Sequence, residues 1–213
     1  NPQTYFTFGN LTLGNSTLTI SAQKANMTAL ITITKTTTLN GSATINVSGA
    51  NNTLALGAVT ETGGMQSLTK TGNGTLTING TGSYTGTTTI SAGTLTLSSG
   101  NAIADSGAVS VDSGAVLNLG ASETLGVISG AGDITMGSYT LTTNVTSNAS
   151  FSGNISSTGG GLTKIGSSTL TLSGNNSYTG ATTISAGTIS ISTVNAVGST
   201  SGVSMANGTA LTY

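Results

Sequence analysis

Few side chains in this sequence could carry out acid–base chemistry, and they are scattered along the chain. Charged residues make up 4% of the 213 residues, as four lysines and five acids, and there is no histidine. The two carboxyl groups nearest in sequence are Asp105 and Asp112, seven residues apart. Hydrolysis of a glycosidic bond requires two carboxyl groups that flank the bond. A single pair across a turn is a weak signal for that chemistry, and we interpret both residues as solvated or turn-capping acids.

Nucleophilic and metal chemistry lack their usual residue types. Without histidine or cysteine, the chain has no imidazole base for a serine nucleophile and no soft ligand for zinc. No run of alternating acids of the kind that binds calcium occurs. Four separated lysines make no basic patch for nucleic acid. We therefore predict a protein that is not an enzyme, that needs no cofactor or metal, and that does not bind nucleic acid.

A long internal repeat fixes the architecture of the chain and therefore the positions of any functional residues. The stretch from Leu68 to Ser98, LTKTGNGTLTINGTGSYTGTTTISAGTLTLS, returns 94 residues later as LTKIGSSTLTLSGNNSYTGATTISAGTISIS, with 20 of 31 positions identical. Within it, aliphatic residues alternate with threonine and serine, which is typical of strands with one buried face. We predict one domain over residues 1–213, with divergent coils in 1–67, a first copy in 68–161 and a partial second copy in 162–213.

A shorter period of about 21 residues lies inside each copy. Gly93 recurs as Gly114, and Gly187 recurs as Gly208. Strands and glycine turns that return every ~20 residues are typical of stacked solenoid coils, each of which buries its aliphatic residues against its neighbours. The sequence thus predicts an all-β fold, a parallel β-helix (β-solenoid) of about ten coils. We expect the four glycines at turns, where valine at Gly93 or Gly187 would clash.

The segment 22–38 is the only one that hints at a helix. Its sequence includes AQKANMTALITITK, whose second half, Leu30 to Ile33, alternates as a strand does. We predict a small loop followed by a strand.

Two residue pairs recur at matching positions of the copies. Lys70 matches Lys164, and Tyr84 matches Tyr178. We interpret the lysines as snorkelling at the edge of a coil, with an intramolecular lysine–asparagine crosslink as the alternative. The tyrosines are interpreted as packing over a corner, with a platform for stacking sugars as the functional alternative.

The repeated phrases carry a family resemblance. The stretches from Gly74 to Gly100 and from Ser168 to Ser192 resemble the passenger-associated transport repeat of bacterial type V autotransporters. The two good copies cover about a quarter of the chain. The resemblance implies a right-handed parallel β-helix exported to a bacterial surface, and the usual hand of parallel crossovers agrees. It does not imply a particular activity.

Function and location follow from this resemblance as expectations. We expect a non-enzymatic structural or adhesive stalk, extracellular or on the bacterial cell surface, with a host or matrix glycan or protein as its partner. A weaker alternative is a carbohydrate-binding β-helix. The chain begins Asn1-Pro2-Gln3 without a leader, so we expect a mature or excised form. No apolar run approaches the ~18 residues of a spanning helix, and we expect no direct membrane insertion.

The aromatic residues at the two ends suggest an alternative function, which is self-association of copies end to end. Tyr5, Phe6 and Phe8 lie near the start, and Leu211 and Tyr213 lie in a final phrase without a polar cap. An open solenoid end exposes unpaired backbone that can pair with another chain. Head-to-tail contacts of this kind do not close and would grow a filament. Truncation of a longer passenger and true polymer ends both fit the sequence.

Overall fold

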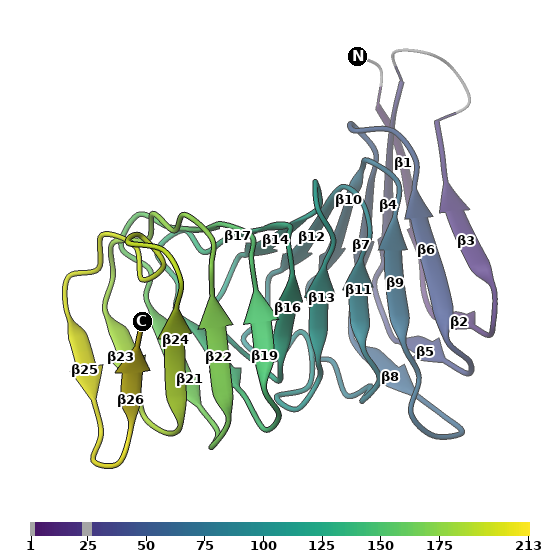
Figure 1. The fold of residues 1–213 in the computed structure, drawn as a ribbon. Helices are drawn as coiled ribbons and strands as arrows, with labels where there is room; N and C mark the ends of the chain where they lie inside the picture. The colour runs from purple at the N-terminus through teal and green to yellow at the C-terminus, as the bar shows by residue number, and fades with distance from the viewer. Residues whose placement is uncertain (1–2, 23–26) are drawn as a thin grey trace.

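The computed structural model describes residues 3–22 and 27–213, and every regular element within these ranges is a β-strand. All assigned strand pairs are parallel. The coils stack along one axis from the purple N-terminal end to the yellow C-terminal end (Figure 1). The fold is the β-solenoid of about ten coils that the sequence predicts.

The strands form three faces. The first face is the eight-stranded sheet, which in spatial order contains β1 (Gln3–Phe8), β4 (Thr28–Ile33), β7 (Thr53–Leu56), β10 (Thr75–Ile78), β12 (Thr94–Leu97), β14 (Val116–Leu119), β17 (Asp133–Thr135) and β20 (Ile155–Ser156). The second face carries two sheets. Its three-stranded sheet contains β2 (Leu11–Leu13), β5 (Thr37–Leu39) and β8 (Val59–Glu61). Its five-stranded sheet contains β15 (Glu123–Leu125), β18 (Leu141–Asn144), β21 (Leu162–Ile165), β23 (Thr182–Ile184) and β25 (Val203–Met205).

The third face is the ten-stranded sheet, which runs the length of the molecule. In spatial order it contains β3 (Thr17–Ile20), β6 (Ala43–Val47), β9 (Leu68–Thr71), β11 (Thr88–Ile90), β13 (Val109–Val111), β16 (Ile128–Gly130), β19 (Ala149–Phe151), β22 (Thr169–Leu172), β24 (Thr188–Ile191) and β26 (Ala210–Thr212). The chain visits the first, second and third faces in that order and then starts the next coil. In segment 22–38, β4 confirms the predicted strand, and β5 begins a second strand at Thr37. The predicted loop falls partly on residues 23–26, outside the described residues.

Some coils leave one face without a strand. Residues 79–87 and 98–108 cross the second face with nothing longer than an isolated bridge, between the three-stranded and five-stranded sheets. Residues 173–181 and 192–202 cross the first face in the same way near the C-terminal end. These loops interrupt the regular stacking of strands, and Tyr84 and Tyr178 lie in two of them.

Alternation along each strand builds the core. In β6, β10, β12, β14 and β22, buried positions alternate with partly exposed ones. The buried residues stack on their counterparts one coil away, as in the column Leu54, Leu76, Leu95 and Leu117. Branched side chains suit such a pleated surface, and their burial supplies the main stabilising free energy.

The outward positions are occupied by hydroxyl groups instead of charges. Along the ten-stranded sheet, the register places one threonine or serine per coil in an unbroken row: Thr17, Thr44, Thr69, Thr89, Ser110, Ser129, Ser150, Thr171, Ser190 and Thr212. None of these residues is buried. Hydroxyl rows of this kind explain how a chain with 4% charged residues presents a polar surface to water.

The two copies of the repeat lie on different faces. The first copy begins on the third face with β9 and passes to the first face with β10. The second copy begins on the second face with β21 and passes to the third face with β22. A shift of 94 residues therefore corresponds to four coils and two further faces. The repeat therefore forms the same local corner at two different edges of the solenoid.

Candidate functional site

The two matching lysines point into the core. Lys70 lies in the column between Ile45 and Ile90, and its ammonium group donates to the backbone oxygens of Thr71 (2.8 Å), Gly72 (2.7 Å) and Ala92 (3.0 Å). The first two oxygens belong to its own corner, and the third belongs to the next coil. Each lysine proton therefore has an acceptor, and the side chain ties two coils together.

Lys164 repeats this arrangement in the second copy. Its ammonium group donates to the oxygens of Ile165 (3.1 Å), Gly166 (2.7 Å) and Ala186 (2.9 Å). Both lysines are fully buried, so the predicted snorkelling at the coil edge is wrong. Burial lowers the pKa of Lys70 to about 8 and also lowers the pKa of Lys164. The crosslink alternative gains no support, because all three protons are directed at backbone oxygens.

Lys70→Met is expected to lower the free energy of unfolding by about 1–2 kcal/mol. Methionine fills similar volume and removes a buried charge, but it leaves three carbonyl groups without their donor. Lys35→Met, at an exposed position, is the matched control and should change stability by less than ~0.5 kcal/mol. Urea denaturation followed by circular dichroism measures both variants. Equal stability of the two variants would show that the three contacts of Lys70 contribute nothing.

The two matching tyrosines fill the core where a strand is missing. Tyr84 lies in loop 79–87, and Tyr178 lies in loop 173–181; both side chains are fully buried. The Tyr84 hydroxyl is 2.7 Å from Thr88 Oγ1, and the Tyr178 hydroxyl is 2.8 Å from Thr182 Oγ1. Burial raises the pKa of Tyr84, and it raises the pKa of Tyr178 to about 12. Neither ring is accessible to a ligand, so the sugar platform is wrong for these residues.

The four predicted turn glycines all adopt positive φ, between 68° and 83°. Their surroundings differ. A Cβ atom on Gly93 would lie 2.4 and 2.5 Å from the oxygens of Gly72 and Gly74, and Gly187 is equally crowded by backbone. A Cβ atom on Gly114 or Gly208 would meet nothing within 4 Å. Only the first glycine of each pair is required by a close approach between coils.

The predicted equivalence of Gly93 and Gly114 is wrong by one residue. The register places Thr88 beside Val109, 21 residues on, but it places Leu95 beside Leu117, 22 residues on. The extra residue is taken up in the turn that holds Gly114, where the Ala115 amide donates to the Asp112 oxygen at 2.9 Å. The same offset separates Gly187 from Gly208, since Thr188 pairs with Ala210.

The remaining ionisable groups assemble no catalytic or metal centre within the described ranges. Asp105 and Asp112 are both exposed, as predicted for solvated acids. Across residues 3–22 and 27–213, no group of three metal-binding side chains lies together. In the same residues, no helix is long and apolar enough to cross a membrane.

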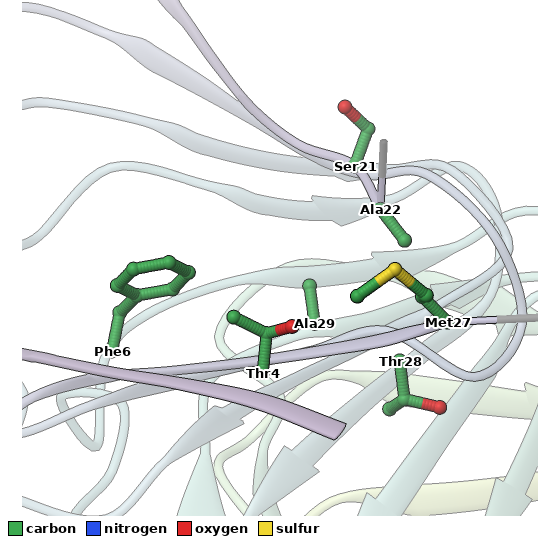
Figure 2. A pocket seen from close by; sticks show the side chains of 7 residues that line it. All are labelled: Thr4, Phe6, Ser21, Ala22, Met27, Thr28 and Ala29. Atoms are coloured by element: carbon green, nitrogen blue, oxygen red, sulfur yellow. The ribbon is translucent and has the colours of Figure 1, made fainter. Parts of the chain in front are cut away.

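The N-terminal end of the solenoid exposes its core. Phe6 and Phe8 begin the two inward columns of the first face, are half exposed, and stack with ring centres 6.4 Å apart; Tyr5 faces outward. Phe6 and Met27 border a cavity of about 230 Å³ beside β1 (Figure 2). A second cavity of about 340 Å³ opens between the three faces and is lined by Phe8, Asn10, Leu11, Leu18, Ile20, Ile31, Ile33 and Leu54.

The C-terminal end exposes the other side of the same core. Leu211 pairs with the buried Ile189 and is itself only partly buried. Tyr213 follows β26 and is 89% exposed, and Val203 and Met205 on β25 are also exposed. The strands β3 and β26 are the two edges of the ten-stranded sheet. The structure thus places the five predicted end residues at opposite ends of the solenoid, where they do not contact one another.

Comparison with known proteins identifies the motif that builds these corners. The family model described as the passenger-associated transport repeat matches residues 68–102 and 162–191. The chain carries two passenger-associated transport repeats. Each transport repeat contains one buried lysine and one buried tyrosine, and Gly93 and Gly187 are crowded by backbone at matching positions.

A curated relative carries the same type of sequence. The chain is 50% identical to the BmaC autotransporter adhesin of Brucella suis biovar 1 (strain 1330) over 155 residues, which is 71% of this chain and 4% of that protein. This chain therefore spans a small part of the length of that relative. No solved structure is significantly similar to the chain. Sequence reasoning identified the transport repeat but missed the buried position of its lysine.

Proposed function

We propose that the chain is a rigid, non-enzymatic segment of an adhesive passenger displayed on a bacterial surface. The observation that carries this proposal is the continuous solenoid built around two transport repeats, with 50% identity to part of an autotransporter adhesin. Parallel strand pairing joins each coil to the next, and the two buried lysines add a bond at two of these junctions. A body joined in this way holds its length along the axis, which suits a stalk that carries contact surfaces away from a cell.

An adhesion assay tests this proposal. Fluorescent beads coated with the folded chain are applied to cultured epithelial cells and to extracellular matrix, and bead retention is counted after washing. We expect several-fold more retention than for beads coated with the heat-unfolded chain. The Gly114→Ala variant, which should keep the fold, is expected to be retained like the original. Equal retention of folded and unfolded chains would contradict an adhesive role for these residues.

The exposed ends favour self-association as a second candidate. Because β26 lies on the third face, the next face in winding order is the one that β1 occupies. The N-terminal coil of a second copy could thus continue the winding, with β3 pairing to β26 in one extended sheet. Phe6, Phe8 and Leu211 would then be covered by the neighbouring core.

Phe8→Asp is expected to abolish concentration-dependent association of the 213-residue chain, because it places a charge in the apolar contact. Tyr139→Ser, at an exposed site away from the ends, is the matched control. Sedimentation velocity across a hundredfold concentration range measures both variants. A monomer at every concentration for the original chain would overturn end-to-end assembly, as would association of Phe8→Asp that is unchanged.

A further inference from the structure

A buried carboxyl group lies where the second face is interrupted. Glu123 is the first residue of β15, the edge strand of the five-stranded sheet, and only 2% of its surface is exposed. The alternation Glu123-Thr124-Leu125 turns its side chain to the same side as Leu125, toward the core. Its neighbour toward the N-terminal end is not a strand but loop 98–108.

The side chain joins β15 to that loop with one oxygen and leaves the other without a partner. The amide of Ile103 donates to Glu123 Oε1 at 2.9 Å. Oε2 is enclosed and has no hydrogen-bond partner among the described residues. The backbone adds one further contact across this boundary, from the Gly126 amide to the Gly107 oxygen at 2.9 Å. A carboxylate in this position would leave part of its charge neither hydrated nor hydrogen-bonded.

The groups that face Glu123 do not compensate a negative charge. Tyr84 from loop 79–87 and Asp105 from loop 98–108 are the titratable neighbours, and neither is a cation. On the other side, β18 contributes Leu141, which does not titrate. Burial is the main cause that raises the pKa of Glu123 to about 7. The backbone groups of Ile103 and Ala102 oppose this rise, and the nearby Asp105 adds a smaller contribution in the same direction as burial.

We propose that Glu123 is a proton-operated latch on loop 98–108. When the group is protonated, the neutral acid fits the enclosed site, and its Oε1 still accepts the hydrogen bond from the Ile103 amide. When the proton leaves, the carboxylate is unfavourable in the enclosed site. Opening of the loop stabilises it, because water can then reach Oε2. The loop is therefore closed in mildly acidic surroundings and opens more often at neutral pH, where its backbone becomes available to proteases or to partners.

The direction of the pH effect follows from linkage. The closed form holds its proton up to about pH 7, whereas the open form has the ordinary value of 4.5. The open form therefore gains population by at most about tenfold per pH unit between these two values and levels off above pH 7. Closure contributes its full stability below pH 4.5 and loses it as the pH rises.

Selective labelling tests the titration directly, because Glu61 and Glu123 are the only glutamates in the chain. With 13C-labelled glutamate, NMR should show one carboxyl signal that titrates near pH 7 and one that titrates below its ordinary value. The signal that titrates below its ordinary value belongs to Glu61, whose pKa is lowered mainly by a hydrogen bond from the Thr85 side chain. If both signals titrate below pH 5, the latch does not exist. This measurement needs no variant and so does not depend on whether a mutant folds.

Hydrogen exchange tests the opening of the loop. After correction for the intrinsic rate, exchange of the Ile103 amide should speed up between pH 5 and pH 7 and then level off. In Glu123→Gln, which is neutral and isosteric, the corrected rate should be flat over this range. A wild-type rate that does not change with pH, or the same rise in the variant, would overturn the proposal.

Discussion

Gly93→Ala is expected to lower the free energy of unfolding by about 3 kcal/mol, whereas Gly114→Ala lowers it by about 1 kcal/mol. Both positions have positive φ, 68° and 83°, so both variants bear the backbone strain of a left-handed residue, ~1 kcal/mol. Only at Gly93 would the new methyl group lie 2.4 Å from a backbone oxygen of the preceding coil. Backbone cannot yield as a flexible side chain does, so the coils must separate locally.

The pair is measured by urea denaturation of both variants, with circular dichroism as the signal. Gly187→Ala and Gly208→Ala repeat the comparison in the second transport repeat, since Gly187 is crowded and Gly208 is open. If the alanine variants at Gly93 and Gly114 lose the same stability, then φ alone matters, and the close approach of neighbouring coils at this corner is incorrect.

Tyr84→Ala is expected to cost about 3–5 kcal/mol, which is the largest effect among the side chains of the repeat. The ring is fully buried in a loop that has no strand to close the core, so nothing else in that coil fills the space. Tyr84→Phe keeps the ring and loses only the bond to Thr88 Oγ1, and we expect about 1 kcal/mol.

The difference between these two variants separates packing from hydrogen bonding. Thermal unfolding and hydrogen exchange of β10 and β11 measure it, and the loss of protection in Tyr84→Ala should be strongest in these flanking strands. A small loss in Tyr84→Ala, comparable to that in Tyr84→Phe, would contradict the role of the tyrosine as the filling of an incomplete coil.

Much of the fold could be predicted because the sequence alternates with a period of two. Phrases such as Thr75 to Ile78 specify which side chains face inward, and the ~21-residue spacing indicates stacked coils. The period is not constant, however. One corner contains an additional residue near Gly114, and glycine-to-glycine matching therefore gave a register that was wrong by one. Matching Leu95 with Leu117 would have found the correct register.

The buried ionisable residues were missed although the same alternation marked them. Lys70 follows Leu68 by two residues, and Glu123 precedes Leu125 by two, so each shares a side with a core leucine. Charge led to the expectation of a solvated lysine. Only the structure shows that the Lys70 ammonium group donates to two carbonyl groups of its own corner and to one of the next coil. The rotation of the second repeat onto another face likewise depends on how many residues each coil uses.

The distance between two labelled outward positions tests the central claim, which is that about ten parallel coils stack in one register. Thr44 and Thr171 lie in the same hydroxyl row, six coils apart. The chain has no cysteine, so Thr44→Cys and Thr171→Cys can carry the only two nitroxide labels. Pulsed electron spin resonance should give one narrow distance near 29 Å, the sum of six strand spacings, ~4.8 Å each. A broad distribution, or a distance that differs by more than ~10 Å, would contradict the stacked solenoid.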